Sequence, residues 1–372
     1  MLQFSHTKWI ESIQWDELSA LFDQIGCETS GPFLNSIFFK SWIGAKANDI
    51  HAFVLYLGET PQNFILVGNR IQNRFGIRIK TACLNQTGNS NDDQIWIEYN
   101  STFNRCSDEN YFYKLLFKEL TLRGYHQVHF SMASSDIFQS EVIQRKGLSS
   151  FSVNGYSRTL DITTTTDTIL SDLSPNSRAK LRRSIKTLKL KFGEVNIEHA
   201  LSLNDKDLFF SELSVLHRNR WGHTSTGSGF DNKVFNQTML SLLRQNPSYC
   251  EILRVKAGAT TLGYTLNLLH QNSVYFYCSG IDHTLSSNHI KPGYVLHLFA
   301  MEYYARKGYI SYDFMGGESQ YKRTLCSERT TFWTVDMPLK NLKGYLVRAT
   351  RALKNLRIVK VALKPLLDYL RQ

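Results

Sequence analysis

Several side chains that can move protons lie within one short stretch of the sequence, residues 311–325, SYDFMGGESQYKRTL, and four of them are candidates for a site. They are one acid in an apolar run and three groups beyond a glycine pair: Asp313, Glu318, Tyr321 and Lys322. The stretch begins like a buried strand, and Gly316-Gly317 then interrupts it. This pattern has two interpretations: a tight turn that leads to the next element, or the floor and rim of an active site that uses acid–base chemistry.

A second group of polar side chains lies in the sequence HRNRW. His217, Arg220 and Trp221 are spaced i, i+3 and i+4, so a helix places them on one face. One interpretation is structural, with a buried histidine and an arginine packed on the tryptophan. The other is a substrate-binding surface, in which Arg220 holds a carboxylate or phosphate. The Gly-, Ser- and Thr-rich sequence that follows, WGHTSTGSGF, predicts a mobile loop over the site.

The sequence LSPNSRAKLRRSIKTLKLKFG, residues 173–193, predicts a basic helix. Ser174 can cap the helix, Pro175 suits its first position, and Gly193 ends it. Between residues 178 and 191 there is no acid, and the polar face carries Arg178, Arg182, Lys186 and Lys189. This face is either a solvated basic surface or a cradle for a phosphorylated ligand.

The composition limits the class of protein. The 372 residues are 42% hydrophobic and 20% charged, which is ordinary for a globular protein, and their number favours two domains. The net charge of +11 favours anionic partners: phosphates, nucleic acid or an anionic membrane surface. No apolar run reaches the roughly 20 residues of a membrane-spanning helix, and the N-terminus does not resemble a signal peptide. The six cysteines form no C-x-x-C pair, which argues against a metal site and favours the cytoplasm.

Two passages share one pattern and begin 184 positions apart, at Tyr113 and His297. They read YKLLFKELTLRGYHQVHF and HLFAMEYYARKGYISYDF, and each predicts an amphipathic helix, a glycine that ends it, and a strand. A strand-like run precedes each helix, at residues 95–100 and 274–280. The sequence therefore predicts two copies of one strand–helix–strand unit.

The two copies differ where chemistry would occur. Asp313 of the second copy is matched by His129 of the first, and only the second has NHIKPGYV before its helix and MGGESQYK after its strand. We therefore expect the second half to be the working copy and the first half to be structural or acceptor-binding. The predicted domains are residues 1–150 and 151–340, followed by a basic amphipathic tail, residues 341–372.

An ordered set of motifs in the second half carries a family resemblance. HxxRW, a Pro-Gly pair before a helix, and YDFxxGxxxYK occur in that order, and the resemblance covers roughly residues 150–335. This part resembles the GNAT-superfamily acyltransferases of the CelD-like group, which is often linked with cellulose or exopolysaccharide biosynthesis. That group is related to the Fem-type peptidyl transferases. The resemblance implies a mixed α/β fold with two tandem GNAT-like domains, each a twisted mixed sheet flanked by helices.

The resemblance also implies a donor site. In this superfamily the pyrophosphate of acyl-CoA binds at the start of the helix after the central strand, where free N–H groups and the helix dipole attract an anion. The matching residues are Lys291, Gly293 and Tyr294. The usual motif Q/R-x-x-G-x-G/A is not intact, because one Gly stands beside a Pro that lacks an N–H group. The structural alternative is an ordinary Pro-Gly helix start.

The resemblance and the residue types suggest roles in acyl transfer. Tyr321 would protonate the leaving thiolate, Lys322 would polarise the carbonyl, and Asp313 or Glu318 would accept the proton of the nucleophile. The glycine pair would free backbone N–H groups beside the thioester. The acceptor would bind to residues of the basic helix and of HRNRW: Arg182, His217, Arg220 and Trp221.

The sequence thus predicts an acyl-CoA-dependent N- or O-acyltransferase without a metal, and the resemblance implies a sugar or amino-sugar acceptor from envelope or exopolysaccharide synthesis. One alternative is a Fem-like peptidyl transferase, for which aminoacyl-tRNA would be the nucleic-acid partner. Another is a scaffold that keeps the acyltransferase fold without catalysis. The basic tail predicts either peripheral contact with the inner, anionic face of a membrane or packing on the preceding domain.

Overall fold

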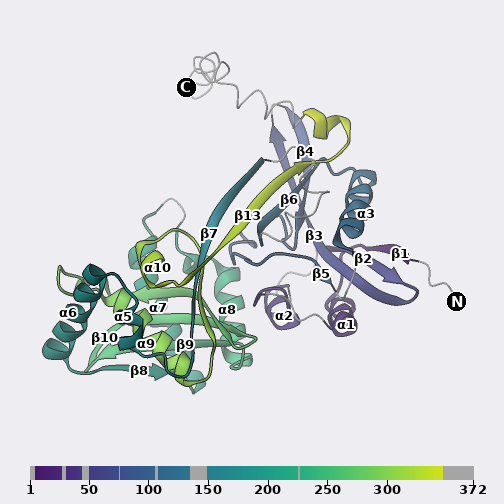
Figure 1. Cartoon of the computed structure of the whole chain (residues 1–372). Coiled ribbons are helices and arrows are strands. Elements are labelled where there is room, and N and C mark those ends of the chain that lie inside the picture. The colour runs from purple at the N-terminus through teal and green to yellow at the C-terminus, as the bar shows by residue number, and fades with distance from the viewer. Residues whose placement is uncertain are drawn as a thin grey trace, which may run out of the picture.

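The computed structural model describes residues 5–26, 31–43, 50–74, 76–104, 108–134, 149–224 and 227–346. One mixed sheet of 13 strands runs through both halves of this part of the chain (Figure 1), which agrees with the predicted mixed α/β class. Twelve strands follow the order β1-β2-β3-β4-β6-β13-β7-β12-β11-β10-β9-β8, and β5 pairs with β3.

Within the ranges that the structure describes, the N-terminal half has six strands and three helices. Their bounds are β1 (Ser5–Ile10), α1 (Trp15–Ile25), α2 (Ser36–Ile43), β2 (His51–Leu57), β3 (Thr60–Arg74), β4 (Ile77–Leu84), β5 (Phe103–Asn104), α3 (Glu109–Leu122) and β6 (Gln127–Ser134). The helix α3 starts at the cap Asp108, whose carboxylate accepts the N–H groups of Asn110 and Tyr111.

The C-terminal half begins with a long strand and carries the basic helix. Its elements are β7 (Ser149–Thr159), α5 (Thr166–Ser171), α6 (Pro175–Phe192), β8 (Val195–His199), α7 (Leu203–Trp221), α8 (Lys233–Gln245), β9 (Cys250–Ala257), β10 (Thr260–His270), β11 (Ser273–Ile281), α9 (Pro292–Arg306), β12 (Ser311–Gly316), α10 (Gln320–Leu325) and β13 (Glu328–Pro338). Two 3-10 turns lie at Gly229–Asp231 and His283–Leu285.

Local signals in the sequence predicted several of these boundaries. Ser174 caps α6 with Pro175 at its first position, and the helix ends before Gly193, as the sequence predicts. Gly124 and Gly308, which end the two repeated helices, adopt left-handed backbone conformations with φ of 73° and 85°. Residues 225–226 of the predicted mobile loop and residues 347–372 of the basic tail lie outside the described residues.

The two halves repeat one topology. In the first half β1, β2, β3 and β4 form antiparallel neighbours and β6 joins β4 in parallel; in the second half β8, β9, β10, β11 and β12 do the same. His129 pairs with Cys83, and Asp313 pairs with Tyr275. The match of His129 with Asp313 is therefore kept in the strand register, as the repeat predicts.

The last strand of each half is exchanged. β7 follows β6 in the chain but pairs antiparallel with β12, whereas β13 follows β12 but pairs antiparallel with β6. β7 and β13 also pair with each other, from Glu328 opposite Ser157 to Asp336 opposite Ser149. The predicted boundary near residue 150 thus falls at the start of a strand that joins the halves.

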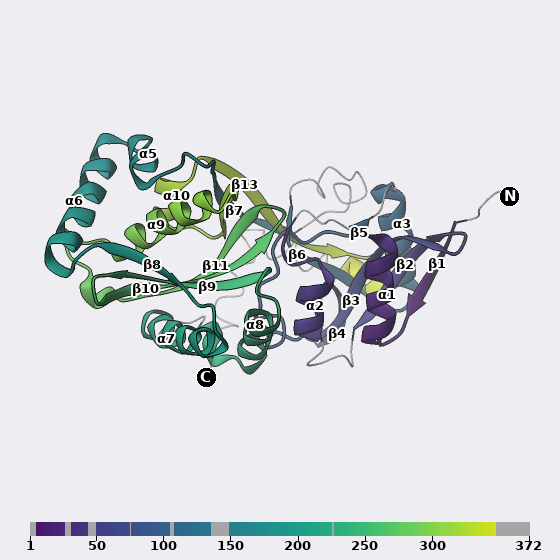
Figure 2. The same cartoon turned by 90° about the horizontal axis from the view of Figure 1, so that it is seen from below.

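Helices cover both faces of the sheet, and one core spans the halves. Figure 2 shows α7 and α8 on one face of the C-terminal half, with α9 and α10 on the other. On the face that α7 and α8 share with α1 and α2, Phe22 and Phe39 belong to the same apolar cluster as Phe210 and Phe235. Burial of this shared surface stabilises the arrangement of the two halves.

The predicted strand at residues 95–100 is wrong. Apart from a single bridge between Asn100 and Ala133, this segment has irregular structure. Trp96 and Tyr99 have left-handed backbones, with φ of 43° and 54°, which a strand cannot accommodate. β4, and not this segment, is the strand that precedes helix α3 in the first copy of the repeat and pairs in parallel with β6.

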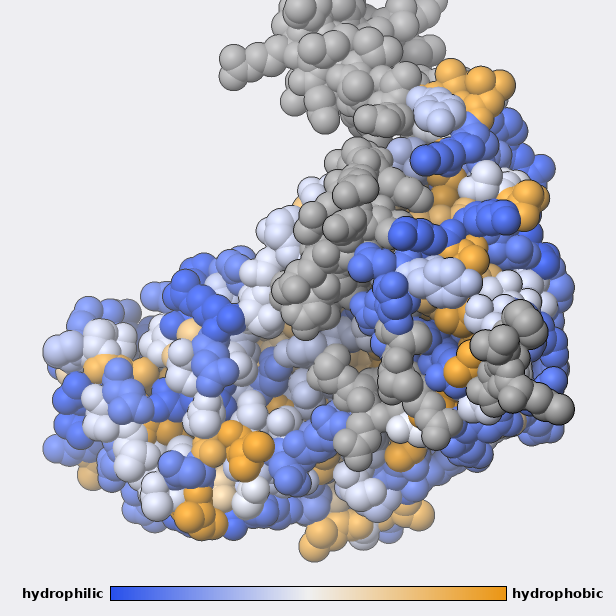
Figure 3. Space-filling view, turned by 45° about the vertical axis from the view of Figure 1, so that its right-hand side comes forward, coloured by the Kyte–Doolittle hydropathy of each residue, from blue (hydrophilic) through white to orange (hydrophobic). Residues whose placement is uncertain are grey.

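The surface is mixed in polarity. On the described part of the face in Figure 3, hydrophobic residues form small patches between hydrophilic ones. No helix in the described ranges combines the length and apolar character needed to cross a bilayer.

Candidate active site

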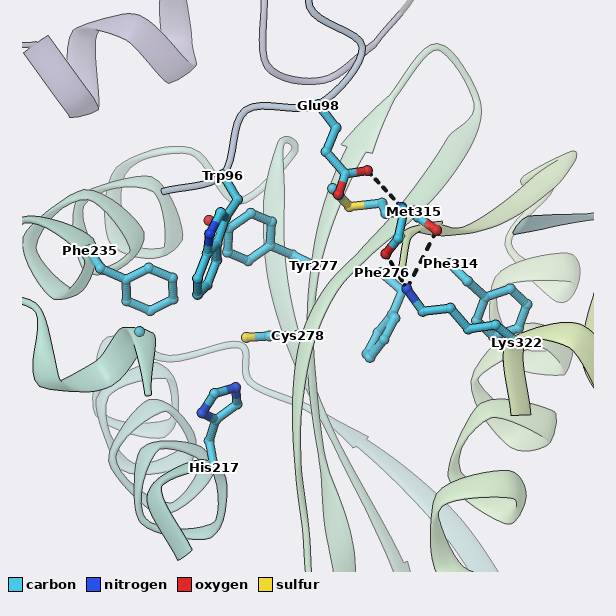
Figure 4. A pocket seen from close by; sticks show the side chains of 12 residues that line it. Trp96, Glu98, His217, Phe235, Phe276, Tyr277, Cys278, Phe314, Met315 and Lys322 are labelled. Atoms are coloured by element: carbon cyan, nitrogen blue, oxygen red, sulfur yellow. Dashed lines mark hydrogen bonds between the residues drawn. The ribbon is translucent and has the colours of Figure 1, made fainter. Parts of the chain in front are cut away.

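The strands β11 and β12 separate and leave a cavity between them. They pair in parallel only from residues 273–275 to 311–313. A bulge at Tyr277 then turns β11, and Met315 bends β12 with a φ of 61°. The cavity of about 280 Å³ is lined by Trp96, Glu98, His217, Gly229, Phe235, Phe276, Tyr277, Cys278, Phe314, Met315, Gly316 and Lys322 (Figure 4).

The corresponding gap in the N-terminal half is filled by its own chain. Between β4 and β6, the Asn100 N–H group donates to the Met132 carbonyl at 3.1 Å, and its side-chain amide donates to the Leu84 carbonyl at 3.1 Å. The Asn85 side chain donates in turn to Asn100 Oδ1 at 2.9 Å. These bonds close the gap between β4 and β6, whereas the corresponding gap between β11 and β12 remains open as the cavity.

The same N-terminal segment reaches across to the C-terminal strands. The Tyr277 hydroxyl donates to the Ile95 carbonyl at 2.5 Å, and the Gly316 N–H group donates to Glu98 Oε2 at 2.7 Å. The Tyr99 hydroxyl donates to Asp313. We call residues 95–99 the crossing segment; its contacts make it a fixed wall of the cavity.

Glu98 is a buried acid that is not among the site residues predicted from the sequence. Its side chain is 8% exposed, and burial raises its pKa to about 7, against the lowering effects of the Gly316 N–H group and Lys322. A carboxylate with a pKa near neutrality is suited to general base catalysis. The signal in the sequence is an acid inside the apolar run IWIEYN, but the alternation of this run predicts a strand and not a site.

Lys322 lies in the cavity, whereas Asp313 lies beside it. The Lys322 ammonium donates to the Gly316 carbonyl at 2.6 Å, and burial lowers its pKa while Glu98 and Asp313 oppose that effect. Burial raises the pKa of Asp313 to about 6. Both Asp313 oxygens accept hydrogen bonds, one from Tyr99 and one from the Met315 N–H group at 2.6 Å. Asp313 therefore orients the crossing segment.

Glu318 and Tyr321 are placed outside the cavity lining. Glu318 is exposed and accepts hydrogen bonds from Asn154 at 2.6 Å and from Tyr156 and Arg323, which lower its pKa. The Tyr321 ring stacks on His297 at 4.8 Å, and burial raises the pKa of its hydroxyl. Tyr321 thus stays protonated behind the wall that Phe276 and Phe314 form.

The glycine pair does not leave free N–H groups, which corrects the expectation for this turn. The Gly316 N–H group donates to Glu98, and the Gly317 N–H group donates to the Asn154 carbonyl at 3.0 Å. The physical reason is that neighbouring chain segments approach the turn closely: a β-carbon on Gly316 would come within 2.7 Å of the Met132 side chain.

The structure separates the members of HRNRW. His217 lines the cavity, hydrogen-bonds to Ser228 at 2.8 Å, and is neutral because burial lowers its pKa to about 4. Arg220 and Trp221 are exposed, with the guanidinium 5.6 Å from the tryptophan ring, and neither lines the cavity. Their spacing predicted one helical face, but the helix turns only His217 inward.

The predicted donor residues lie at the start of α9, away from the cavity lining. Lys291 is the residue before the helix, and its N–H group donates to Ser184 of α6 at 2.8 Å. Gly293 and Tyr294 lie in the first turn. Arg182 lines a different groove, of about 580 Å³, together with Lys186 and Lys189. Within the described ranges, no three His, Cys, Asp or Glu side chains form a group that could hold a metal ion.

Comparisons with known proteins identify the class of the C-terminal half. Residues 175–323 match the sequence profile of the acetyltransferase (GNAT) domain. No curated protein matches the chain. The GNAT match makes the protein a transferase with a GNAT-type acyltransferase domain; the CelD-like group stays a prediction.

Solved structures resemble the whole chain in fold. FemX is 10% identical, with a TM-score of 0.55 over 92% of this chain and 100% of its own. L-PGS from Bacillus licheniformis is 11% identical, with a TM-score of 0.52 over 92% and 97%. The C-terminal domain of a putative lysylphosphatidylglycerol synthetase from Agrobacterium fabrum is 12% identical, with a TM-score of 0.51 over 91% and 96%.

Proposed function

We propose that the protein transfers an acyl group from a CoA thioester to an amine or hydroxyl, with Glu98 as the base. The observation that carries this proposal is the pair Glu98 and Lys322, both buried, which face one cavity between the separated strands of a GNAT domain. Acyl transfer needs a proton acceptor for the nucleophile and a positive charge beside the carbonyl oxygen. This cavity offers both groups.

The chain offers an anion site for the donor substrate at the start of α9. The N–H groups of Gly293 and Tyr294 belong to the first turn, where they have no partner within the helix. The Lys291 side chain adds a positive charge, and the bond to Ser184 holds the basic helix α6 against this turn. These features fit a pyrophosphate, with fewer N–H groups than the usual motif supplies.

Each residue has one task in the proposed reaction. Glu98 removes the proton of the acceptor nucleophile as it bonds to the acyl carbon, and Lys322 stabilises the oxyanion that forms there. The C–S bond then breaks, and the thiolate takes up the proton that Glu98 removed from the nucleophile, because Tyr321 lies behind the Phe276 and Phe314 side chains, outside the cavity lining. Asp313 acts through Tyr99, because it fixes the crossing segment that carries Glu98.

The acceptor that we propose is a sugar or amino sugar, acted on at the cytoplasmic side of the envelope. The aromatic residues of the cavity wall support a ring-shaped acceptor: Trp96, Phe235 and Tyr277. A basic surface also fits peripheral contact with an anionic membrane, since the net charge is +11.

A second candidate is the transfer of an aminoacyl group from tRNA. Helix α6 carries seven Lys and Arg residues and no acid, and it lies beside the proposed donor site. The similarity in fold to FemX, over 92% of this chain, favours the same candidate. Phosphates of a tRNA would bind this helix through charge.

Titration calorimetry with acetyl-CoA and with a charged tRNA tests the proposal. Binding of acetyl-CoA, lost in Gly293→Glu and retained in Glu318→Gln, is expected. Binding of the charged tRNA alone would replace the proposal with the second candidate. A protein that binds neither would favour the non-catalytic scaffold.

A further inference from the structure

Trp96 has an unusual backbone and position for so large a residue. Its φ is 43°, in a region that bulky side chains rarely adopt, and its side chain is 49% exposed at the cavity. Strained residues of this kind persist only where surrounding contacts hold them, and they cluster at functional sites.

Contacts on both sides fix the backbone around Trp96. The Ile95 carbonyl accepts the Tyr277 hydroxyl, and Glu98 accepts the Gly316 N–H group. Upstream, the Asn232 side chain donates to the Asn91 carbonyl and to the Gln94 side chain, both at 2.6 Å. The ring of Trp96 is thus set in advance, since the strands and α8 of the other half hold its segment.

The indole lies where it can face a ligand. Figure 4 shows the Trp96 ring beside Phe235 and Tyr277, with Glu98 further along the same segment toward Lys322. Trp96 and Glu98 are two positions apart in the chain, so their Cα atoms are at most about 7 Å apart. Both side chains line the same cavity, so the face of a six-membered ring would cover the indole while an amine substituent on that ring reaches the carboxylate.

We propose that Trp96 is the acceptor platform, and that the acceptor carries its reactive amine on a ring. The inference rests on the proposed function for the chemical step, but ring binding does not require it. A flat ring face packs on the indole. An ammonium group on that ring is stabilised by cation–π contact with the aromatic wall and by the negative charge of Glu98. An open-chain amine can reach Glu98 but cannot cover the indole with a preformed face.

Binding of two matched amine pairs tests the platform. The pairs are cyclohexylamine with n-hexylamine, and D-glucosamine with its open-chain reduction product, glucosaminitol; calorimetry or ligand NMR measures affinity for the wild type and variants. We expect the cyclic member of at least one pair to bind about three- to tenfold more tightly. Preference in the first pair alone indicates a hydrocarbon ring, and preference in the second indicates a sugar.

Trp96→Gly is the informative variant, because glycine adopts the left-handed backbone without strain and keeps the fold. It should lose the preference for rings, and Trp96→Phe should keep part of it. The matched control is Tyr111→Ala, which removes another exposed aromatic side chain, 43% exposed, that does not line the cavity. The control should keep the preference.

Three results would overturn the platform: no ring preference in the wild type, no binding of any cyclic probe, or a preference that survives in Trp96→Gly. Acetyl-CoA titration of the same proteins separates this inference from the proposed function. Ring preference without acetyl-CoA binding would exclude the acyl-CoA reaction and support the platform. Acetyl-CoA binding without ring preference would support the acyl-CoA reaction and exclude the platform.

Discussion

Replacing Glu98 by glutamine should lower activity and, above neutral pH, raise stability. The amide oxygen of the new side chain can still accept the Gly316 N–H group, which is 2.7 Å from Glu98 Oε2, so the crossing segment keeps its contact. The substitution removes only the negative charge and the ability to take a proton. Loss of a general base typically costs about 10²- to 10⁴-fold in rate.

The expected stability change follows from the pKa of Glu98. Burial raises it from 4.5 to about 7, so the folded protein holds this proton more tightly than the unfolded chain does. Stability that is present below pH 4.5 is therefore lost as the pH rises through 7. At about 1.4 kcal/mol per pH unit, the loss between about pH 5 and pH 8 is about 2–3 kcal/mol in the wild type. Glu98→Gln should escape this loss.

Urea unfolding at about pH 5 and about pH 8 measures the difference directly. Asp313, whose pKa is raised to about 6, remains in both proteins and contributes the same background. The control is Glu318→Gln, because Glu318 is exposed and its pKa is lowered, so removing its charge should not add stability at the higher pH. If Glu98→Gln and the wild type lose the same free energy between the two pH values, Glu98 is not a buried acid of this kind.

Three further predictions concern the donor site, the oxyanion and the exchanged strands. Gly293→Glu should weaken acetyl-CoA binding at least tenfold in calorimetry, because it adds a negative charge at the start of the helix. A β-carbon at this position would also come within 2.9 Å of the Ile281 side chain. Unchanged affinity in the folded variant would exclude this site. Lys322→Met keeps the apolar stem but removes the ammonium, so turnover should fall about 10²-fold in steady-state kinetics; near-normal turnover would make Lys322 structural. Residues 151–340 produced alone should show no cooperative thermal transition, because β13 then lacks β6 as a partner; a sharp transition would show that the half folds by itself.

The sequence by itself determined the features that depend on nearby residues. The helix bounded by Ser174 and Gly193, the glycines that end the repeated helices, and the helix–strand part of the repeat were all predictable. Caps, helix stops and apolar spacing act within a few positions, so a single sequence contains them. The motifs around Lys322 also predicted that this lysine would lie at the candidate site of the C-terminal half.

Only the tertiary structure decided which residues meet at that cavity. Glu98 contacts Gly316, 218 positions further along the chain, and Tyr99 contacts Asp313 across 214 positions. The run that contains Glu98 alternates like a strand, but long-range hydrogen bonds and the left-handed backbone of Trp96 override that local preference. The exchange of β7 and β13 has the same origin: each strand pairs with a strand of the other half, and this pairing depends on packing between segments that lie far apart in the sequence.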